Sequence, residues 1–340
     1  MIILAIETSC DETSTAILRA TKGKLELLSN IVSSQIDIHK QYGGVVPEVA
    51  ARHHVLNINP VINESLDVAR IKAKDIDLIA TVSGPGLITS LIVGVEAAKT
   101  LSMAWKKPLM QINHMYSHIA GNFLNKIEFP VMCLVVSGGH TELVYLKNYW
   151  QFKKIGQTVD DAAGEAFDKV AKLLGLGYPG GPIVSAEADK FKAKELSIKF
   201  PRPMIDSDNF NFSFSGLKTS VLYATQKMTA EEKKKKIPEI CFGFQQAVID
   251  VLVSKTIKAS KQFKVKTVLM AGGVAANKSL RESLKNASEN NGYEFFVPEF
   301  KLCTDNAAMV ALAAYYLSQN KKPKLDNWKK VKVDPNWELK

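Results

Sequence analysis

The sequence lacks the features that mark several specialised protein classes. Its four cysteines among 340 residues show no C-x-x-C spacing, which excludes a zinc ribbon and gives no disulfide framework. No apolar run reaches the ~18–20 residues that a membrane-spanning helix needs. The opening stretch MIILAIETSCDET has no basic leader and predicts a buried strand rather than a signal peptide. We therefore expect a cytoplasmic protein without membrane attachment.

Acidic residues are too few to balance the basic ones, which leaves a formal net charge of +10. Such a surplus attracts polyanions such as nucleic acid, mainly through phosphate contacts. Part of it is local, in EEKKKKIPE (231–239) and KKPKLDNWKKVKV (321–333). Solvated lysines with no partner would give the same pattern, so both interpretations stay open, and the two runs are candidate docking surfaces.

The common phosphate-binding fingerprints are also missing. The glycine-rich stretch TVLMAGGVAANKSLRESL (267–284) predicts a buried strand, a turn and a helix starting near Asn277. It matches neither the P-loop nor the dinucleotide-binding G-x-G-x-x-G pattern. Glycines at such a junction would still let a flat ligand lie against the backbone. A plain strand–turn–helix corner is the alternative.

Two segments share one design. Residues 2–18 and 130–146 each run from an apolar strand through a short polar turn into a second strand, and helical patterns follow each pair. The helical patterns lie at 46–66, 88–105, 161–176 and 238–263. We predict a duplicated α/β protein with a nucleotide in the cleft between its halves.

A histidine pair offers the clearest candidate for chemistry. His114 and His118 lie four residues apart in NHMYSHIAG, so on a helix both rings would share one face and could share one metal ion. Met115 stands where the H-E-x-x-H zinc proteases carry glutamate, which argues against a protease. Two ordinary helix histidines remain the plain alternative.

Asp305 is the candidate third ligand. It lies in CTDNAAMVALAAYYL (303–317), where a last helix is predicted to open. Thr304 or Asp305 would cap that helix. Two histidines and one carboxylate are also a common arrangement for catalytic zinc or iron(II).

Taken together, the motifs strongly resemble the bacterial TsaD family of tRNA N6-adenosine threonylcarbamoyltransferases, once described as O-sialoglycoprotein endopeptidases. The motifs are AIETSCDET, GGVVPEVAARHH, SGPGLITSLIVG, NHMYSHIAG, VSGGHTELV, DDAAGEAFDKVAKLLGLGYPGGP, FSFSGLKTSV, MAGGVAANKSLR and CTDNAAMVA. They follow the family's order from Met1 to about Gln319, and only the basic tail after Asn320 has no match.

The resemblance implies an ASKHA (actin/Hsp70-like) fold of two duplicated RNase H-like lobes with an interlobe cleft. We place the first lobe at residues 1–120 plus 304–340 and the second at 121–303. It also implies the reaction. The threonylcarbamoyl group of threonylcarbamoyl-AMP moves to N6 of the adenosine just 3′ of the anticodon, in tRNAs that read codons starting with A, and AMP leaves. The protein must orient this activated donor, polarise its carbonyl and exclude water.

The resemblance assigns roles residue by residue. His114, His118 and Asp305 match the metal ligands, with iron(II) usually named and zinc able to use the same set. The remaining matches are to substrate-binding positions, with the phosphate loop first and the nucleoside side after it: Val135, Val136, Ser137, Gly138, Gly139, Asp168, Gly181 and Asn277.

Asp11 and Glu12, expected opposite the phosphate loop, are our candidates for handling the proton of the attacking amine. Shaping the loop's electrostatics, or contacting a partner, is the alternative. Some family members carry an acidic residue where Ser185 stands, so one ribose contact is expected to be absent.

The resemblance also implies partners: tRNA, a paralogous TsaB-like subunit, a TsaE-like ATPase and an upstream synthase that makes the adenylate. Two other functions stay open. An ASKHA kinase or ATPase would transfer the γ-phosphate of ATP with magnesium. A nucleotide-holding scaffold of a tRNA-modifying complex would not need the metal ligands.

Overall fold

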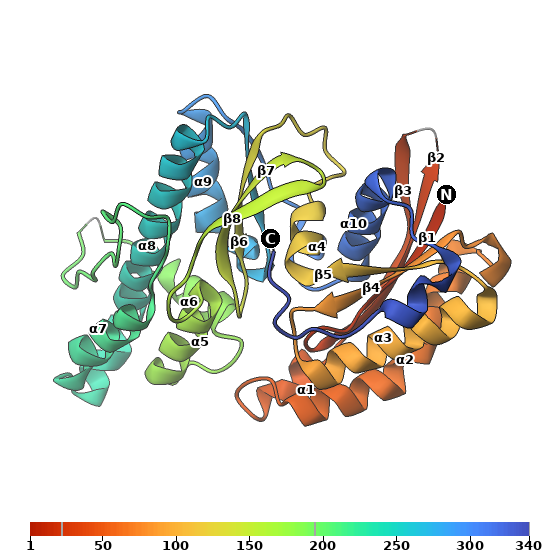
Figure 1. Cartoon of the computed structure of the whole chain (residues 1–340). Coiled ribbons are helices and arrows are strands. Elements are labelled where there is room, and N and C mark those ends of the chain that lie inside the picture. Colours follow the sequence, from red (N-terminus) through yellow and green to blue (C-terminus); the bar gives the residue numbers. More distant parts are fainter. Residues whose placement is uncertain (22, 194, 340) are drawn as a thin grey trace. The chain divides into compact units, whose positions relative to one another are not determined.

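The computed structural model describes residues 1–21, 23–193 and 195–339. The chain forms two compact units (Figure 1). Unit 1 comprises Met1–Ile127, Tyr149–Gln151 and Pro298–Lys340, and unit 2 comprises Glu128–Asn148 and Phe152–Val297.

Unit 1 is built on a five-stranded sheet in the order β3-β2-β1-β4-β5. Its central strand β1 pairs antiparallel with β2 and parallel with β4, and β5 is parallel to β4. Because β1 and β4 are covered on both faces, they are nearly continuous apolar runs. The strands are β1 (Ile2–Glu7), β2 (Glu12–Thr21), β3 (Lys24–Ser34), β4 (Leu78–Gly84) and β5 (Leu109–Asn113).

Helices cover both faces of this sheet (Figure 1). Leu4 and Ile6 of β1 share a buried cluster with Ile58 and Val95 of the paired helices α2 and α3, and the other face of the sheet packs against α10. Gly94 of α3 lies against Thr8, where any side chain would collide, so close packing explains this glycine. The helices are α1 (Ile36–Lys40), α2 (Pro47–Ala69), α3 (Ile88–Trp105), α4 (His114–Ala120) and α10 (Ala307–Asn320), with short 3-10 turns η1 (Ala73–Asp75), η3 (Phe300–Leu302) and η4 (Leu325–Lys330).

Unit 2 repeats the plan. Its sheet has the order β10-β9-β6-β7-β8, and β6 again pairs antiparallel with the next strand, β7, and parallel with β9. The predicted duplication is therefore confirmed at the level of topology. The strands are β6 (Val131–Val136), β7 (Thr141–Asn148), β8 (Gln151–Gln157), β9 (Thr267–Ala271) and β10 (Glu294–Phe296).

The helices described for unit 2 are α5 (Ala163–Leu174), α6 (Gly180–Ala188), α7 (Ser215–Gln226), α8 (Ala230–Gln262) and α9 (Lys278–Glu289), with the 3-10 turn η2 (Gly273–Ala276) before α9. Among the described residues, α8 alone is long and apolar enough to cross a membrane, but 67% of that stretch is buried within the fold. This is what the core helix of a soluble protein shows, so the stretch is weak evidence for a membrane span.

Two helix starts differ from the sequence-based prediction. Helix α8 begins at Ala230 rather than near residue 238, because Thr229 and Glu232 form a capping box that brings the lysine run 233–236 into the helix. Helix α10 begins at Ala307, and its N-cap is Asn306, whose side chain accepts from the N–H of Met309 at 3.2 Å. The predicted cap at Thr304 or Asp305 is therefore wrong.

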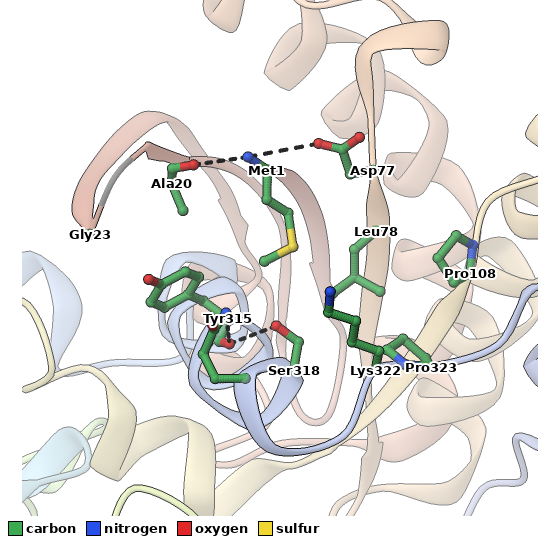
Figure 2. A pocket seen from close by; sticks show the side chains of 11 residues that line it. Met1, Ala20, Gly23, Asp77, Leu78, Pro108, Tyr315, Ser318, Lys322 and Pro323 are labelled. Carbon is green, nitrogen blue, oxygen red and sulfur yellow. Dashed lines mark hydrogen bonds and ion pairs between the residues drawn. The ribbon is translucent and has the colours of Figure 1, made fainter.

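The segment after α10 is part of unit 1 rather than a loose tail. The N–H of Asp334 donates to the carbonyl of Ser83 at 2.8 Å, and the backbone of Asp334 lies so close to Gly84 that no side chain could fit there. At the base of this segment, a pocket of about 480 Å³ opens between Met1, Asp77, Tyr315 and Lys322 (Figure 2). Its lining includes none of the predicted site residues.

Candidate functional site

The paired histidines lie on α4, which follows β5 directly. Asn113 caps this helix, because its Oδ1 accepts from the N–H of Tyr116 at 3.1 Å. His114 and His118 then share one helix face, with ring centroids 4.6 Å apart. They are only 6% and 1% exposed. Two imidazoles therefore lie side by side in a buried position.

Asp305 completes the group from the other end of unit 1's sequence. It lies just before the N-cap of α10, and its Oδ1 is 3.1 Å from Nε2 of His118 and 3.6 Å from Nε2 of His114. One ligand atom from each of the three residues lies within 4.8 Å of the others. Since Asn306 caps the helix, the Asp305 carboxylate remains directed at the histidines.

The chemistry of this cluster fits a metal ion. Among the described residues, neither ring nitrogen of His118 has a hydrogen-bond partner, although Nε2 lies close to the Asp305 carboxylate. Buried polar atoms are normally satisfied, and a cation between the rings and the carboxylate would satisfy Nε2. Two imidazoles and one carboxylate suit zinc or iron(II).

Buried polar groups contact Nδ1 of His114, while Nε2 of the ring is the nitrogen near Asp305. Nδ1 of His114 lies 3.0 Å from Oε2 of Glu7 and 3.1 Å from Oγ of Ser9, and Oε1 of Glu7 accepts from the N–H of Ser9 at 2.6 Å. Such contacts fix the ring so that Nε2 faces the ligand group. Glu7 belongs to the motif AIETSCDET, but its role was not foreseen, since strand residues that face a helix cannot be distinguished from core residues by sequence alone.

Electrostatics act in both directions on His114. Burial disfavours the protonated ring, but the negative charges of Asp305 and Glu7 prevail and raise the pKa of His114 to about 9. A metal bound by this ring would have to displace that proton.

Asp11 ends the turn between β1 and β2, Glu12 is the first residue of β2, and each is 8% exposed. Burial, followed by the negative charges of Asp305 and Asp11, raises the pKa of Glu12 well above its usual value. Glu12 also accepts from Oγ of Ser34 at 3.2 Å. Their predicted part in proton transfer stays a prediction.

A third histidine supports the same turn. In α2, Nδ1 of His54 lies 2.8 Å from Oγ1 of Thr13, and Nε2 lies 3.0 Å from the carbonyl of Cys10. Burial lowers the pKa of His54, as expected for a neutral ring that bridges two polar groups. His54 therefore contacts the residues on either side of the two carboxyl groups and holds this segment in place, a role that the motif GGVVPEVAARHH did not reveal.

The predicted phosphate loop lies in unit 2 where β6 ends. Val135 and Val136 close the strand, and a side chain added at Gly138 or Gly139 would meet open space. The start of α5 packs against the loop, since a Cβ at Gly164 would lie 2.6 Å from the carbonyl oxygen of Ser137. The loop thus presents open backbone beside a helix N-terminus, which favours an anionic group.

The glycine-rich turn that follows β9 lies against the end of β6. Gly272, at φ +92°, lies against the carbonyl of Val136, where no side chain would fit. Because β6 and β9 are parallel, the turns that follow them lie at one edge of the sheet, which is where ligands bind in open α/β sheets. The two glycine-rich turns are thereby brought together.

Asp168 lies on α5, and its side chain reaches the start of α6, where Gly181 lies. Oδ1 of Asp168 accepts from the N–H of Gly180 at 2.7 Å. Burial raises the pKa of Asp168, while the N–H groups of Gly180 and Gly181 partly offset this effect. Gly181 faces open space. The predicted ribose contact by Asp168 stays a prediction, and its carboxylate already holds the α6 terminus.

Asn277 has two structural contacts of its own. As the N-cap of α9, its Oδ1 accepts from the N–H of Leu280 at 2.9 Å, and its Nδ2 donates to Oε1 of Gln245 at 2.7 Å. The side chain is fixed, and its predicted contact with adenosine stays a prediction.

The predicted residues fall into two groups. Asp11, Glu12, His114, His118 and Asp305 belong to unit 1, and the substrate-binding candidates all belong to unit 2.

Comparison with known proteins gives consistent matches over nearly the whole chain. Residues 26–312 match the TsaD family, described as tRNA N6-adenosine threonylcarbamoyltransferase. Relatives of that name are 51% identical over 321 residues in Thermosipho africanus, covering 93% of this chain and 94% of the relative, and 50% identical over 317 residues in Syntrophomonas wolfei, covering 93% and 92%.

Solved structures share the fold at low identity. HypF from T. kodakarensis superposes with a TM-score of 0.66 at 15% identity, covering 96% of this chain and 49% of that one. Component A of the (R)-2-hydroxyglutaryl-CoA dehydratase of Acidaminococcus fermentans gives 0.55 at 17% identity, covering 93% and 99%. These likenesses show the two-lobed ASKHA fold.

Proposed function

The chain belongs to the TsaD family of tRNA N6-adenosine threonylcarbamoyltransferases, and on that basis we propose the reaction it performs. The threonylcarbamoyl group of threonylcarbamoyl-AMP moves to N6 of the adenosine just 3′ of the anticodon, in tRNAs that read codons starting with A. The bond between the carbamoyl carbon and the phosphate oxygen breaks, a carbon–nitrogen bond forms, N6 loses one proton and AMP leaves.

His114, His118 and Asp305 would hold a divalent metal, for which we propose Fe²⁺ and, as the alternative, Zn²⁺. When bound, the metal supplies a Lewis acid and an anchor for the oxygens of the threonylcarbamoyl group. The observation that carries this assignment is the buried His118, whose ring nitrogens have no hydrogen-bond partner among the described residues, beside the Asp305 carboxylate.

The residues of unit 2 would orient the AMP part of the donor. The open backbone at Gly138 and Gly139, next to the start of α5, suits its phosphate. Val135, Val136 and Ser137 shape that loop, while Asp168, Gly181 and Asn277 would contact the nucleoside. Holding a reactive anhydride in one orientation supplies much of the required acceleration.

The attacking nitrogen must lose a proton, and we propose that Asp11 and Glu12 handle it. Both are buried carboxyl groups at the junction of the β1–β2 turn and β2 in unit 1, and a carboxyl group within hydrogen-bond reach of N6 could accept that proton.

We also propose the family's partners and location: a TsaB-like paralogue, a TsaE-like ATPase and an upstream synthase in the cytoplasm, with lobes at residues 1–120 plus 304–340 and at 121–303. Several apolar side chains stay exposed on the packed pair α2 and α3, among them Leu56 at 68% and Met103 at 56%. Exposed apolar side chains on two packed helices suit contact with a protein partner, and we assign this contact to the paralogue.

The test is transfer of labelled threonine into unmodified tRNA, using synthase-made threonylcarbamoyl-AMP and the partner subunits. The wild type should modify the tRNA, and the double variant His114→Ala/His118→Ala should not. Equal modification by both would make the histidines structural and favour a nucleotide-holding scaffold of a tRNA-modifying complex. If neither modifies the tRNA while ATP is turned over, an ASKHA ATPase or kinase takes the place of the transferase.

A further inference from the structure

The C-terminal segment has an apolar side that is anchored in unit 1. Val331 is 2% exposed within the core cluster around β1, and Trp328 and Val333 pack against the same cluster. Nδ2 of Asn327 donates to the carbonyl of Leu109 at 3.0 Å. The backbone of this segment is therefore fixed in place on β5 and α3.

Its other side consists of lysines. We call residues 321–332 the basic strap, which carries six lysines and a single acidic residue, Asp326. All six lysines are exposed, and none forms an ion pair with any described carboxylate. They are Lys321, Lys322, Lys324, Lys329, Lys330 and Lys332.

The other lysine run, at 233–236 in α8, is different. Lys235 pairs with Glu231 at 2.9 Å and Lys236 with Glu239 at 3.1 Å, while Lys233 donates to the carbonyl of Leu173. Most of its charge is already engaged within unit 2. The two runs look alike in sequence, and only the structure shows which one offers free positive charge.

The basic strap also leads to the candidate metal group within unit 1. Five residues beyond Lys332, the carbonyl of Trp337 accepts from Nδ2 of Asn113 at 2.8 Å, and Asn113 caps the helix that carries both histidines. At ~3.3–3.6 Å per residue, those five residues span at most ~18 Å. The Lys332 end of the strap therefore lies at most ~18 Å from Trp337, which bonds the cap residue of α4.

We infer that the basic strap binds backbone phosphates of the tRNA substrate and holds the anticodon region near the candidate metal group. The inference rests on the proposed function for the identity of the RNA. Exposed lysines without ion-pair partners on an anchored backbone suit a polyanion, because each phosphate contact releases counterions and little backbone entropy is lost on binding. Lys329 also lies over the ring of Trp328, 5.6 Å from its centroid, and the residue remains exposed.

The test compares two variants of equal charge change in the full chain with its partner subunits. The strap variant is Lys329→Glu/Lys330→Glu/Lys332→Glu. The matched control is Lys227→Glu/Lys234→Glu/Lys235→Glu, at exposed positions directly after α7 and within α8. Binding of unmodified tRNA is measured by fluorescence anisotropy between 50 and 200 mM salt. Threonine transfer then gives kcat and the KM values for tRNA and for the donor.

We expect the strap variant to weaken tRNA binding by about tenfold or more, and to reduce the slope of log Kd against log salt by about 2 to 3. Its KM for tRNA should rise while its KM for the donor stays unchanged, and the control should match the wild type. The milder variant Lys329→Gln/Lys330→Gln/Lys332→Gln should fall in between. Unchanged melting temperature and metal content would show that the strap variant is folded.

The inference is overturned if the strap variant binds tRNA with wild-type affinity and salt dependence, or if the control loses as much. It is also overturned if strap charge governs binding to anionic lipid vesicles and not to tRNA. A wild type that binds tRNA through the strap but transfers no threonine would instead overturn the proposed reaction.

Discussion

At the scale of single residues, His118 carries most of the evidence for a metal. It is almost completely buried, and its ring nitrogens have no hydrogen-bond partner among the described residues. We expect His118→Ala to be purified without bound metal, because one of three protein ligands is lost. Elemental analysis of purified protein checks this, and His53→Ala, whose ring contributes no atom to the group, should keep its metal.

Glu7 offers a graded version of the same test. Its carboxylate orients His114 from behind, and loss of such a contact typically weakens metal binding 10–100-fold. We expect Glu7→Gln to bind metal in that weaker range in a competition titration with a chelator. A Glu7→Gln protein that binds as tightly as the wild type would show that His114 does not depend on Glu7.

Two glycines of unit 2, Gly164 and Gly138, allow a packing role to be distinguished from a binding role by substitution. A Cβ at Gly164 would lie 2.6 Å from the Ser137 carbonyl, whereas one at Gly138 meets open space. We expect Gly164→Ala to lower the free energy of unfolding by about 1–3 kcal/mol, measured by urea titration. Gly138→Ala should leave stability unchanged and reduce transfer. Equal stability of both variants would contradict the packing described for the loop.

At the scale of elements, α7 receives its cap from a distant residue. Phe214 at the N-cap position has no side-chain cap, and Asp160 accepts from the N–H groups of Phe214 and Ser215 at 2.8 and 3.2 Å. We expect Asp160→Asn to cost roughly 0.5–1 kcal/mol at neutral pH, the low end for caps because Asp160 is exposed. Urea unfolding of both proteins checks this.

The difference in unfolding free energy between the wild type and Asp160→Asn should also depend on pH. Burial alone would raise the pKa of Asp160, but hydrogen bonds from Ser213, Phe214 and Ser215 prevail and lower it. The contribution of Asp160 is therefore full above its unfolded pKa of ~3.9 and is lost as pH falls through the lower folded pKa. The stability difference between wild type and Asp160→Asn should vanish in that acidic range. A difference that persists there would contradict the charged cap.

Elements also show where prediction from sequence succeeded. The strand pairs β1–β2 and β6–β7, strand β9 and helices α2, α3 and α5 lie close to their predicted ranges, because their apolar residues follow a clear strand or helix period. No range was predicted for the outer strands β3, β5, β8 and β10 or for β4. The start of α8 was missed because its capping box stands before a run of lysines, which gives no apolar period to follow. The cap of α10 was missed because Asp305 and Asn306 are neighbours and either side chain can cap a helix. The tail was missed because its anchors, Trp328 and Val331, stand between lysines.

At the scale of the whole molecule, we predict that unit 2 binds the nucleotide and that unit 1 binds the metal. The fragment 128–297 contains every candidate nucleotide residue, and the metal ligands lie outside it. Expressed alone, it should bind AMP, as measured by calorimetry, and take up no metal at the site described. Binding of metal by this fragment with the stoichiometry of the full chain would contradict the assignment.

The site as a whole could be read only in part from the sequence. Spacing suggested that His114 and His118 share a helix face, and motifs pointed to Asp305, which the structure brings beside them. Glu7, Ser9, His54 and Asn113 could not be found this way, because their roles come from pairings between residues far apart in the chain. How the carboxyl groups of Asp11 and Glu12 act on the substrate remains a prediction.

The most direct test of the account is threonine transfer by enzyme stripped of metal and then reloaded. We predict that the stripped enzyme transfers no threonine to tRNA, and that Fe²⁺ or Zn²⁺ restores transfer in proportion to bound metal in the wild type but not in His114→Ala/His118→Ala. Full transfer by the stripped wild type, or equal restoration in the variant, would contradict a metal held by His114, His118 and Asp305.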